Sequence, residues 1–276
     1  MYSISRIVPS INLPGFVALI GALSSAIPAV ASDLDLTLRV AEADSVRLSF
    51  PLGPDRQAEL QVQGSRVGVT VDGGDAQPLL DEPQPLNGEI MVTVADYDFD
   101  GMSDIGVLES HGYGGVNLFI AVYVFDPDTG SFRHWLTDSN LHVDPAAREI
   151  HAAQRSGPRY FTTTYRLHGS EPYPYREAVT IGPGLEKVTL RDETGAEMDT
   201  RMLEAGDGLR AVRAVVAERA YFHDAPDEAS RLRSYIVRGD EVELLNSAGE
   251  WDEWLFVRYR GNRVFEHWIR TEAVIR

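Results

Sequence analysis

The residues best suited to chemistry are four aspartates that lie close together in the chain. Residues 96–104 read Asp-Tyr-Asp-Phe-Asp-Gly-Met-Ser-Asp, so carboxylates alternate until a glycine permits a sharp turn. Carboxylates this close repel one another unless a cation lies between them. Oxygen ligands at this density are typical of Ca²⁺ sites. The predicted calcium ligands are Asp96, Asp98, Asp100, the carbonyl oxygen of Met102, and Asp104.

The segments on either side of this loop are typical of strands and not of the helices of an EF-hand. Residues 90–95 and 105–108 are apolar and β-prone, and the twelfth position of the loop, where an EF-hand needs a bidentate Glu, is Val107. We therefore expect a structural calcium loop placed between two strands. The alternative is a solvated acidic turn without a metal.

Short strands with polar turns are expected along most of the chain. Leu34, Leu36, Leu38 and Val40 alternate with polar residues, as in a half-buried strand. Residues 116–125 are a long run of strand formers, and the turn sequence at 126–130 predicts a hairpin. Residues 76–88, which contain several prolines, are expected to form a loop. Because helix signals are weak, the pattern predicts an all-β fold with an N-terminal sandwich or barrel-like domain.

The N-terminus has the organisation of a secretory signal peptide. Arg6 precedes an apolar stretch at 16–23, and Ala29-Val-Ala31 is a small-x-small cleavage site. The apolar stretch is shorter than a bilayer span requires, which disfavours the alternative of an uncleaved anchor. We expect cleavage after Ala31, a periplasmic or secreted mature protein, and no membrane span in the mature chain.

Composition excludes several classes of function. The formal net charge is −17, the opposite of the basic footprint of a nucleic-acid-binding protein. The chain has no cysteine, which excludes disulfide scaffolds, zinc fingers and thiol nucleophiles. It also lacks the motifs of serine hydrolases, zinc proteases and nucleotide-binding enzymes. We therefore expect a protein that is not an enzyme. The alternative is a cryptic cell-wall hydrolase that uses a pair of carboxylates, which the sequence does not exclude.

An ordered set of motifs carries a family resemblance over residues 85–192. The acidic loop is followed by His111-Gly-Tyr-Gly-Gly-Val-Asn117, by the hairpin turn at 126–130, and by Arg155-Ser-Gly-Pro-Arg-Tyr160. This set resembles periplasmic immunity proteins that inhibit lysozyme-like effectors of type IV secretion systems, which in turn look like periplasmic lysozyme inhibitors. The resemblance implies a mostly β domain with bound Ca²⁺.

The resemblance also implies a loop that plugs the cleft of a lysozyme-like peptidoglycan hydrolase. The implied target-binding residues are Tyr113, Gly114, Gly115 and Asn117, with a second patch of Ser156, Gly157 and Tyr160. An exposed tyrosine on a glycine-rich loop suits an interface anchor, and an acidic inhibitor is steered towards a basic hydrolase. The alternative for residues 112–115 is a plain connection between strands.

Residues 211–276 resemble a bacterial SH3-like domain, implying a small C-terminal β-barrel. The resemblance rests on Ala220-Tyr-Phe, on Tyr235-Ile-Val-Arg-Gly-Asp-Glu-Val242, on Gly249-Glu-Trp251 and on the aromatic stretch 254–259. It implies an aromatic groove that takes peptidoglycan, a peptide or a partner protein, with Tyr221, Trp251 and Tyr259 as candidates. The alternative is that these aromatics fill a small core.

These observations divide the chain into a signal peptide at 1–31, a β-rich immunity-like domain at 32–203, a linker at 204–210 and an SH3-like domain at 211–276. The expected function is a calcium-stabilised periplasmic inhibitor of a peptidoglycan hydrolase. The alternatives are a non-inhibitory envelope-binding module and a cryptic cell-wall hydrolase.

Overall fold

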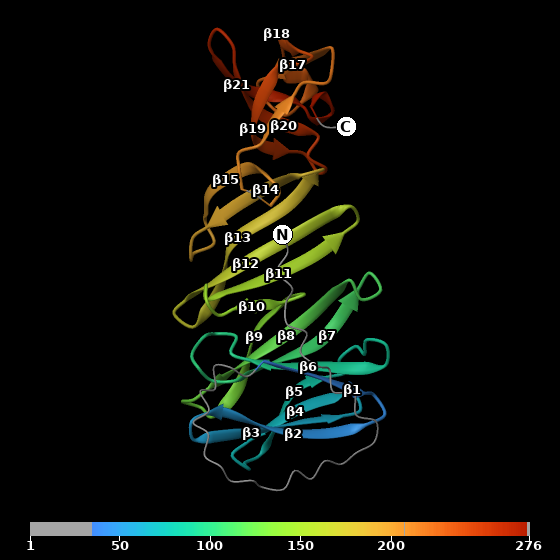
Figure 1. Cartoon of the computed structure of the whole chain (residues 1–276), viewed down its shortest axis with the longest axis vertical. Coiled ribbons are helices and arrows are strands. Elements are labelled where there is room, and N and C mark those ends of the chain that lie inside the picture. Colours follow the sequence, from blue (N-terminus) through green and yellow to red (C-terminus); the bar gives the residue numbers. More distant parts are fainter. Residues whose placement is uncertain (1–34, 207, 275–276) are drawn as a thin grey trace. The chain divides into compact units, whose positions relative to one another are not determined.

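The computed structural model describes residues 35–206 and 208–274, and it confirms the all-β expectation (Figure 1). The described residues hold antiparallel strands and two short 3-10 helices, Glu228–Ser230 and Thr271–Ala273, but no α-helix. None of their helices is long and apolar enough to cross a membrane. The expected signal peptide lies outside the described residues. The chain divides into two compact units between Arg148 and Glu149.

The first unit contains two antiparallel sheets. One has the order β1 (Leu36–Ala41), β6 (Glu89–Ala95), β7 (Asp104–Gly112), β8 (Asn117–Asp126) and β9 (Ser131–Ser139). The other has the order β2 (Ser45–Gly53), β3 (Arg56–Gln63), β4 (Arg66–Val71) and β5 (Ala76–Asp81). The short strand β10 (His142–Asp144) follows them in the chain.

A single hydrophobic core joins these two sheets, as in a β-sandwich. Alternate residues of β3 point into it, among them Leu60, which is fully buried. Ile105 and Val107 enter the same core from β7. Because β7 begins at the end of the acidic loop, the packing of these side chains fixes the strand that carries the loop.

The expected loop at 76–88 is wrong in its first half. Residues Ala76–Asp81 form strand β5, which pairs with β4 at the edge of its sheet. Pro78 lies opposite Gly68 in this pairing. An edge strand tolerates a proline because the backbone on its outer side has no neighbouring strand to which an N–H would donate. The proline is therefore a poor indicator of a loop here.

The second unit also contains two antiparallel sheets. Its first five strands run in sequence order: β11 (Glu149–Ser156), β12 (Arg159–His168), β13 (Glu171–Gly182), β14 (Leu185–Arg191) and β15 (Glu197–Glu204). The other sheet has the order β16 (Val212–Ala214), β19 (Glu241–Ala248), β20 (Trp254–Arg260), β21 (Val264–Arg270), β17 (Arg219–His223) and β18 (Arg231–Val237). Its edge strands β16 and β18 do not pair in the described part of the chain, so the sheet is not a closed barrel.

Residues on both sides of the expected linker share the core of the second unit. Leu185 and Met202, on β14 and β15, are buried in one cluster with Ala211 and Leu244. The backbone N–H of Ala211 also donates to the carbonyl of Met202 at 3.1 Å. The described residues of the expected linker, 204–206 and 208–210, therefore belong to a compact unit. The division into separately folding domains stays a prediction.

Candidate functional site

The acidic loop connects β6 to β7 and brings three carboxylates together. Asp96, Asp98 and Asp104 each offer one oxygen, and these oxygens lie within 4.8 Å of one another. Three carboxylate oxygens at this separation can hold a metal ion. The sequence prediction of these three ligands therefore agrees with the geometry.

Hydrogen bonds from the loop's own backbone hold it in shape. The two oxygens of Asp96 accept from the N–H groups of Asp100 at 3.1 Å and Gly101 at 3.0 Å. Gly101 has a φ of +87°, a conformation that side chains disfavour. The carboxylate of Asp100 accepts from the N–H of Met102 at 2.7 Å and is not part of the cluster of three. Asp100 and the Met102 carbonyl stay predictions as ligands.

Asp104 is the buried anchor of the loop. Asp104 is only 1% exposed. Oδ2 accepts from the N–H of Tyr97 at 2.8 Å, and Oδ1 accepts from the N–H of Phe125 on β8 at 2.9 Å. Asp104 thus ties both ends of the loop to the sheet.

Burial makes the charged forms of these carboxylates costly in the absence of a cation. It raises the pKa of Asp98 to about 6, with the charge of Asp100 adding to the effect. Burial also holds the pKa of Asp104 well above its usual range, and repulsion from the charge of Asp98 adds to this effect. Burial raises the pKa of Asp96 as well. A divalent cation among them would favour the ionised forms.

Arg148 is a contact of the loop that sequence reasoning missed. Its guanidinium Nη1 donates to the carbonyl of Phe99 at 3.1 Å and lies 5.2 Å from the centre of the Phe99 ring. The two residues are far apart in the chain, so no local motif signals this contact. It joins the acidic loop to the segment that follows β10.

The predicted target-binding loop is the tip of the β7–β8 hairpin. Tyr113 is 59% exposed, and Val116 beside it is also exposed. Tyr113, Gly114 and Gly115 have φ values of 51°, 63° and 92°, so three successive residues are left-handed. Two glycines make this backbone possible, and it presents the tyrosine ring to solvent.

The base of this tip is fastened from the side by a residue that sequence reasoning missed. The amide of Asn140 donates to the carbonyl of Val116 at 2.9 Å and accepts from the N–H of Leu118 at 3.2 Å. A Cβ added at Gly115 would lie 3.0 Å from Leu86, so a second segment also packs closely here. Asn117 is 3% exposed and is therefore not part of the exposed tip.

The second predicted patch lies at the β11–β12 turn, in the other unit. Ser156 pairs with Arg159 across the turn, where Gly157 has a φ of +61°. Tyr160 is 52% exposed, and the Arg155 guanidinium lies 5.5 Å from its ring centre. The two patches belong to separate units, so each is considered as a site by itself.

Arg159 is engaged in a buried ion pair that the sequence does not indicate. Its guanidinium lies 2.8 Å from Oδ2 of Asp252, and the side chains are 18% and 10% exposed. The other oxygen of Asp252 accepts from the Ser247 hydroxyl at 2.6 Å. The guanidinium also lies 5.3 Å from the ring centre of Trp251. This cluster connects the β11–β12 turn to the β19–β20 turn.

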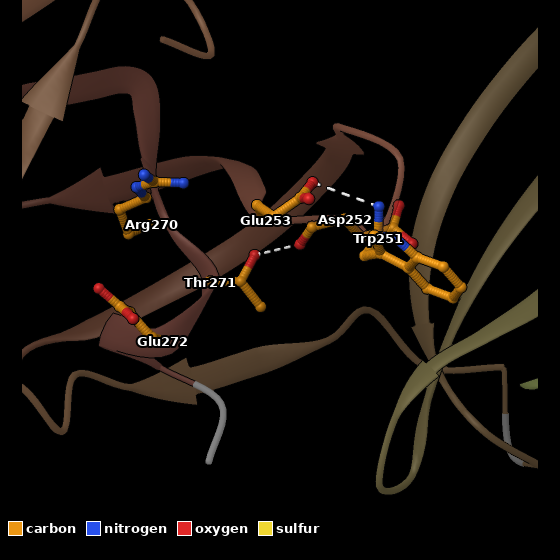
Figure 2. Close-up of a pocket in the computed structure, with 6 residues that line it drawn as sticks. All are labelled: Trp251, Asp252, Glu253, Arg270, Thr271 and Glu272. Carbon is orange, nitrogen blue, oxygen red and sulfur yellow. Dashed lines mark hydrogen bonds between the residues drawn. The ribbon is translucent and has the colours of Figure 1, made fainter. Parts of the chain in front are cut away.

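An open pocket of about 380 Å³ adjoins Trp251, as Figure 2 shows. Trp251 is 63% exposed, and the remaining lining is polar: Asp252, Glu253, Arg270, Thr271 and Glu272. The other two candidate groove aromatics do not line it. Tyr221 packs beside Tyr235, with ring centres 5.5 Å apart, and Tyr259 packs against the core near Phe265.

No family model matches the chain, and no curated protein matches it. Among the solved structures it matches is one described as "Structure of a Xanthomonas Type IV Secretion System related protein", with 14% identity and a TM-score of 0.38. That match covers 64% of this chain and 97% of the other.

Proposed function

We propose that this protein is exported to the periplasm, is stabilised by Ca²⁺, and inhibits a lysozyme-like peptidoglycan hydrolase without being an enzyme itself. The observation that carries the proposal is the β7–β8 tip, where Tyr113 is 59% exposed on a tightly constrained backbone. A protruding tyrosine on a prearranged loop loses little conformational entropy when it enters a cleft. It would exclude substrate by occupying the cleft.

Hydrogen bonds that fix the backbone of the tip support an interface anchor at this position. Asn140 bonds the backbone on both sides of Asn117, at Val116 and Leu118. The N–H of Gly115 donates to the carbonyl of Gly112 at 3.1 Å and closes the turn. A plain connection between strands would not need these additional bonds. An interface anchor benefits from them because its orientation is set before the partner arrives.

Charge supports a basic target. The net charge of −17 steers association towards a positively charged partner and raises the rate of encounter. This steering weakens as salt is added. The proposed calcium ion would have a structural role. Asp96, Asp98 and Asp104 would hold it at the start of β7, the strand that ends at the tip.

The test is a turbidity assay on bacterial wall suspensions with a lysozyme-type hydrolase. The mature protein should slow clearing, Tyr113→Ala should weaken this inhibition at least tenfold, and Tyr113→Phe should keep most of it. Met198→Ala, at a similarly exposed apolar residue of β15, is the matched control and should leave inhibition unchanged. Clearing of walls by the pure protein alone would instead establish the alternative of a hydrolase.

The Trp251 pocket favours a second candidate function, an envelope-binding module that does not inhibit. The exposed Trp251 lines the same pocket as Arg270 and Glu272, so the pocket offers an apolar ring together with hydrogen-bonding groups, a combination that suits sugars or peptides. Pull-down on purified sacculi tests it. Binding that is lost in Trp251→Ala, in a protein that fails to inhibit any lysozyme-type enzyme tried, would favour this second function.

A further inference from the structure

The outer face of the β17–β18 hairpin presents arginine and tyrosine side chains together. Arg219 and Tyr221 lie on β17, and Arg231, Arg233 and Tyr235 lie on β18. Tyr221 is directly opposite Tyr235, so the two rings share a face. Ile236, which alternates with these residues on β18, is buried in the core. We call these five residues the arginine–tyrosine face.

The side chains of this face stack on one another. The Arg231 guanidinium lies 3.6 Å from the ring centre of Tyr221, and the Arg219 guanidinium lies 4.9 Å from that of Tyr235. Stacking of this kind restrains a guanidinium while leaving N–H groups at its edge for a further acceptor. The same arginines lower the pKa of Tyr221 through hydrogen bonds to its hydroxyl. The face is thus arranged before any partner binds.

The arginines of this face carry positive charge that the chain leaves unmatched. In the described part of the chain, Arg219, Arg231 and Arg233 form no ion pair with a carboxylate. Many arginines elsewhere in the same unit do pair with a carboxylate; Arg210 and Arg258, for example, both contact Glu243. In a chain with 42 acidic residues, three arginines without a carboxylate on one hairpin need an explanation.

The acidic residues of the adjoining turn are already engaged. Asp224 lies 3.5 Å from His267, Asp227 accepts from the N–H of Ser230 at 2.9 Å, and Glu228 lies 2.7 Å from Arg270. They are therefore not positioned to neutralise the arginine–tyrosine face. At physiological ionic strength more distant charges are screened beyond about 8 Å, so the local charge decides what binds.

The position of β18 indicates the shape of the partner. It is the last strand of its sheet, and no strand of the described residues pairs with its outer edge. An extended peptide can add to such an edge through main-chain hydrogen bonds. Its alternate side chains would then lie opposite Arg231, Arg233 and Tyr235, which also alternate. Carboxylates at those positions could form bidentate pairs with the guanidinium groups.

We infer that the arginine–tyrosine face, with the free edge of β18, is a docking site for an extended protein segment that carries acidic residues at alternate positions. Tyrosine and arginine are the side chains that dominate interface energies, and Val237 adds an exposed apolar contact at the end of the strand. This inference is independent of the proposed inhibition, because the β7–β8 tip belongs to the other unit.

The test is calorimetric titration of the mature protein with the blocked octapeptide (Glu-Val)4. We expect binding, at least tenfold weaker binding of (Gln-Val)4, and at least tenfold weaker binding by Arg231→Ala with Arg233→Ala. Arg263→Ala is the matched control, because this arginine also stacks on an aromatic ring, Phe265, but on another hairpin. Its affinity should stay within twofold. Melting curves of both variants confirm that they are folded.

Three outcomes would overturn the inference. The first is an absence of (Glu-Val)4 binding at millimolar peptide, and the second is an affinity unchanged by the double substitution. The third is full competition by polyphosphate together with equal binding of a (Glu-Val)4 peptide methylated on its backbone nitrogens. That result would mean that the face binds anionic polymers without strand addition. Loss of binding on backbone methylation supports the inference.

Discussion

The carboxylate of Asp104 accepts a hydrogen bond from the backbone N–H of Phe125 at 2.9 Å. Asp104 is the first residue of β7 and Phe125 lies near the end of β8, so this bond closes the hairpin at the end opposite Tyr113. The second oxygen of Asp104 faces the acidic loop and accepts from Tyr97. One buried carboxylate therefore links the candidate metal loop to the hairpin that carries the candidate inhibitory tip.

Calcium should raise the melting temperature of the mature protein, because it binds the folded loop and not the unfolded chain. Asp98→Ala combined with Asp100→Ala should abolish the rise, measured by calorimetry with calcium or with EDTA. Asp128→Ala, in the exposed turn between β8 and β9, is the control and should keep the full rise. A wild-type melt that is the same in calcium and EDTA would mean that the loop is not a calcium site.

The stability of the metal-free protein should fall as pH rises through the acidic range. The folded-state pKa of Asp98 is raised to about 6 by burial, whereas an unfolded aspartate titrates near about 3.9. The folded protein therefore binds more protons between these values, and the stability that this supplies is lost as pH rises through about 6. Urea unfolding in calcium-free buffer measures it. Asp98→Asn should flatten the slope between pH 4 and pH 7, and an unchanged slope would contradict the assignment.

Asn140→Ala should weaken inhibition although Asn140 is not on the exposed tip. The substitution removes the hydrogen bonds to Val116 and Leu118, each worth about 1 kcal/mol. The tip would then sample more conformations, and binding would carry the cost of ordering it again. We expect several-fold weaker inhibition with Tyr113 intact. Thr137→Ala, on the strand β9 that directly precedes Asn140, serves as control. Equal inhibition by Asn140→Ala and wild type would show that the tip needs no such support.

The sequence predicts those parts of the fold and site that depend on local spacing. The all-β fold follows from period-2 alternation, and the clustered carboxylates Asp96, Asp98 and Asp104 lie within the pattern Asp-x-Asp-x-Asp-Gly-x-x-Asp. The spacing does not indicate that its third aspartate, Asp100, is outside the cluster. The contacts of Arg148 with Phe99 and of Arg159 with Asp252 join residues far apart in the chain. No local pattern encodes such pairs, because they depend on how strands register in the folded sheet.

Met202→Ala tests how residues 149–203 and 211–276 depend on each other. Met202 is 1% exposed and packs in one core with residues of β17–β21. Truncating a buried methionine costs about 2–5 kcal/mol, and here the loss should appear in the unfolding of the whole second unit. The fluorescence of Trp254, buried in this unit, reports it during urea titration when Trp135, Trp251 and Trp268 are replaced by Phe. A Trp254 transition that does not move would instead show that residues 211–276 fold independently, as the sequence predicts.

The Arg159–Asp252 pair should contribute strongly to the stability of the second unit. The two groups are 2.8 Å apart and largely buried, and removing one partner of such a pair costs about 3–5 kcal/mol because the other charge is left unpaired. Arg159→Met and Asp252→Ala should each lower the urea midpoint. The double variant should lose much less than the sum of the two, because neither charge is then left buried alone. The exposed pair Arg47–Glu59, at 3.0 Å, is the control cycle and should give less than about 1 kcal/mol. Additive losses at Arg159 and Asp252 would show that their contact adds nothing to stability and that each residue acts through its other contacts, Trp251 and Ser247.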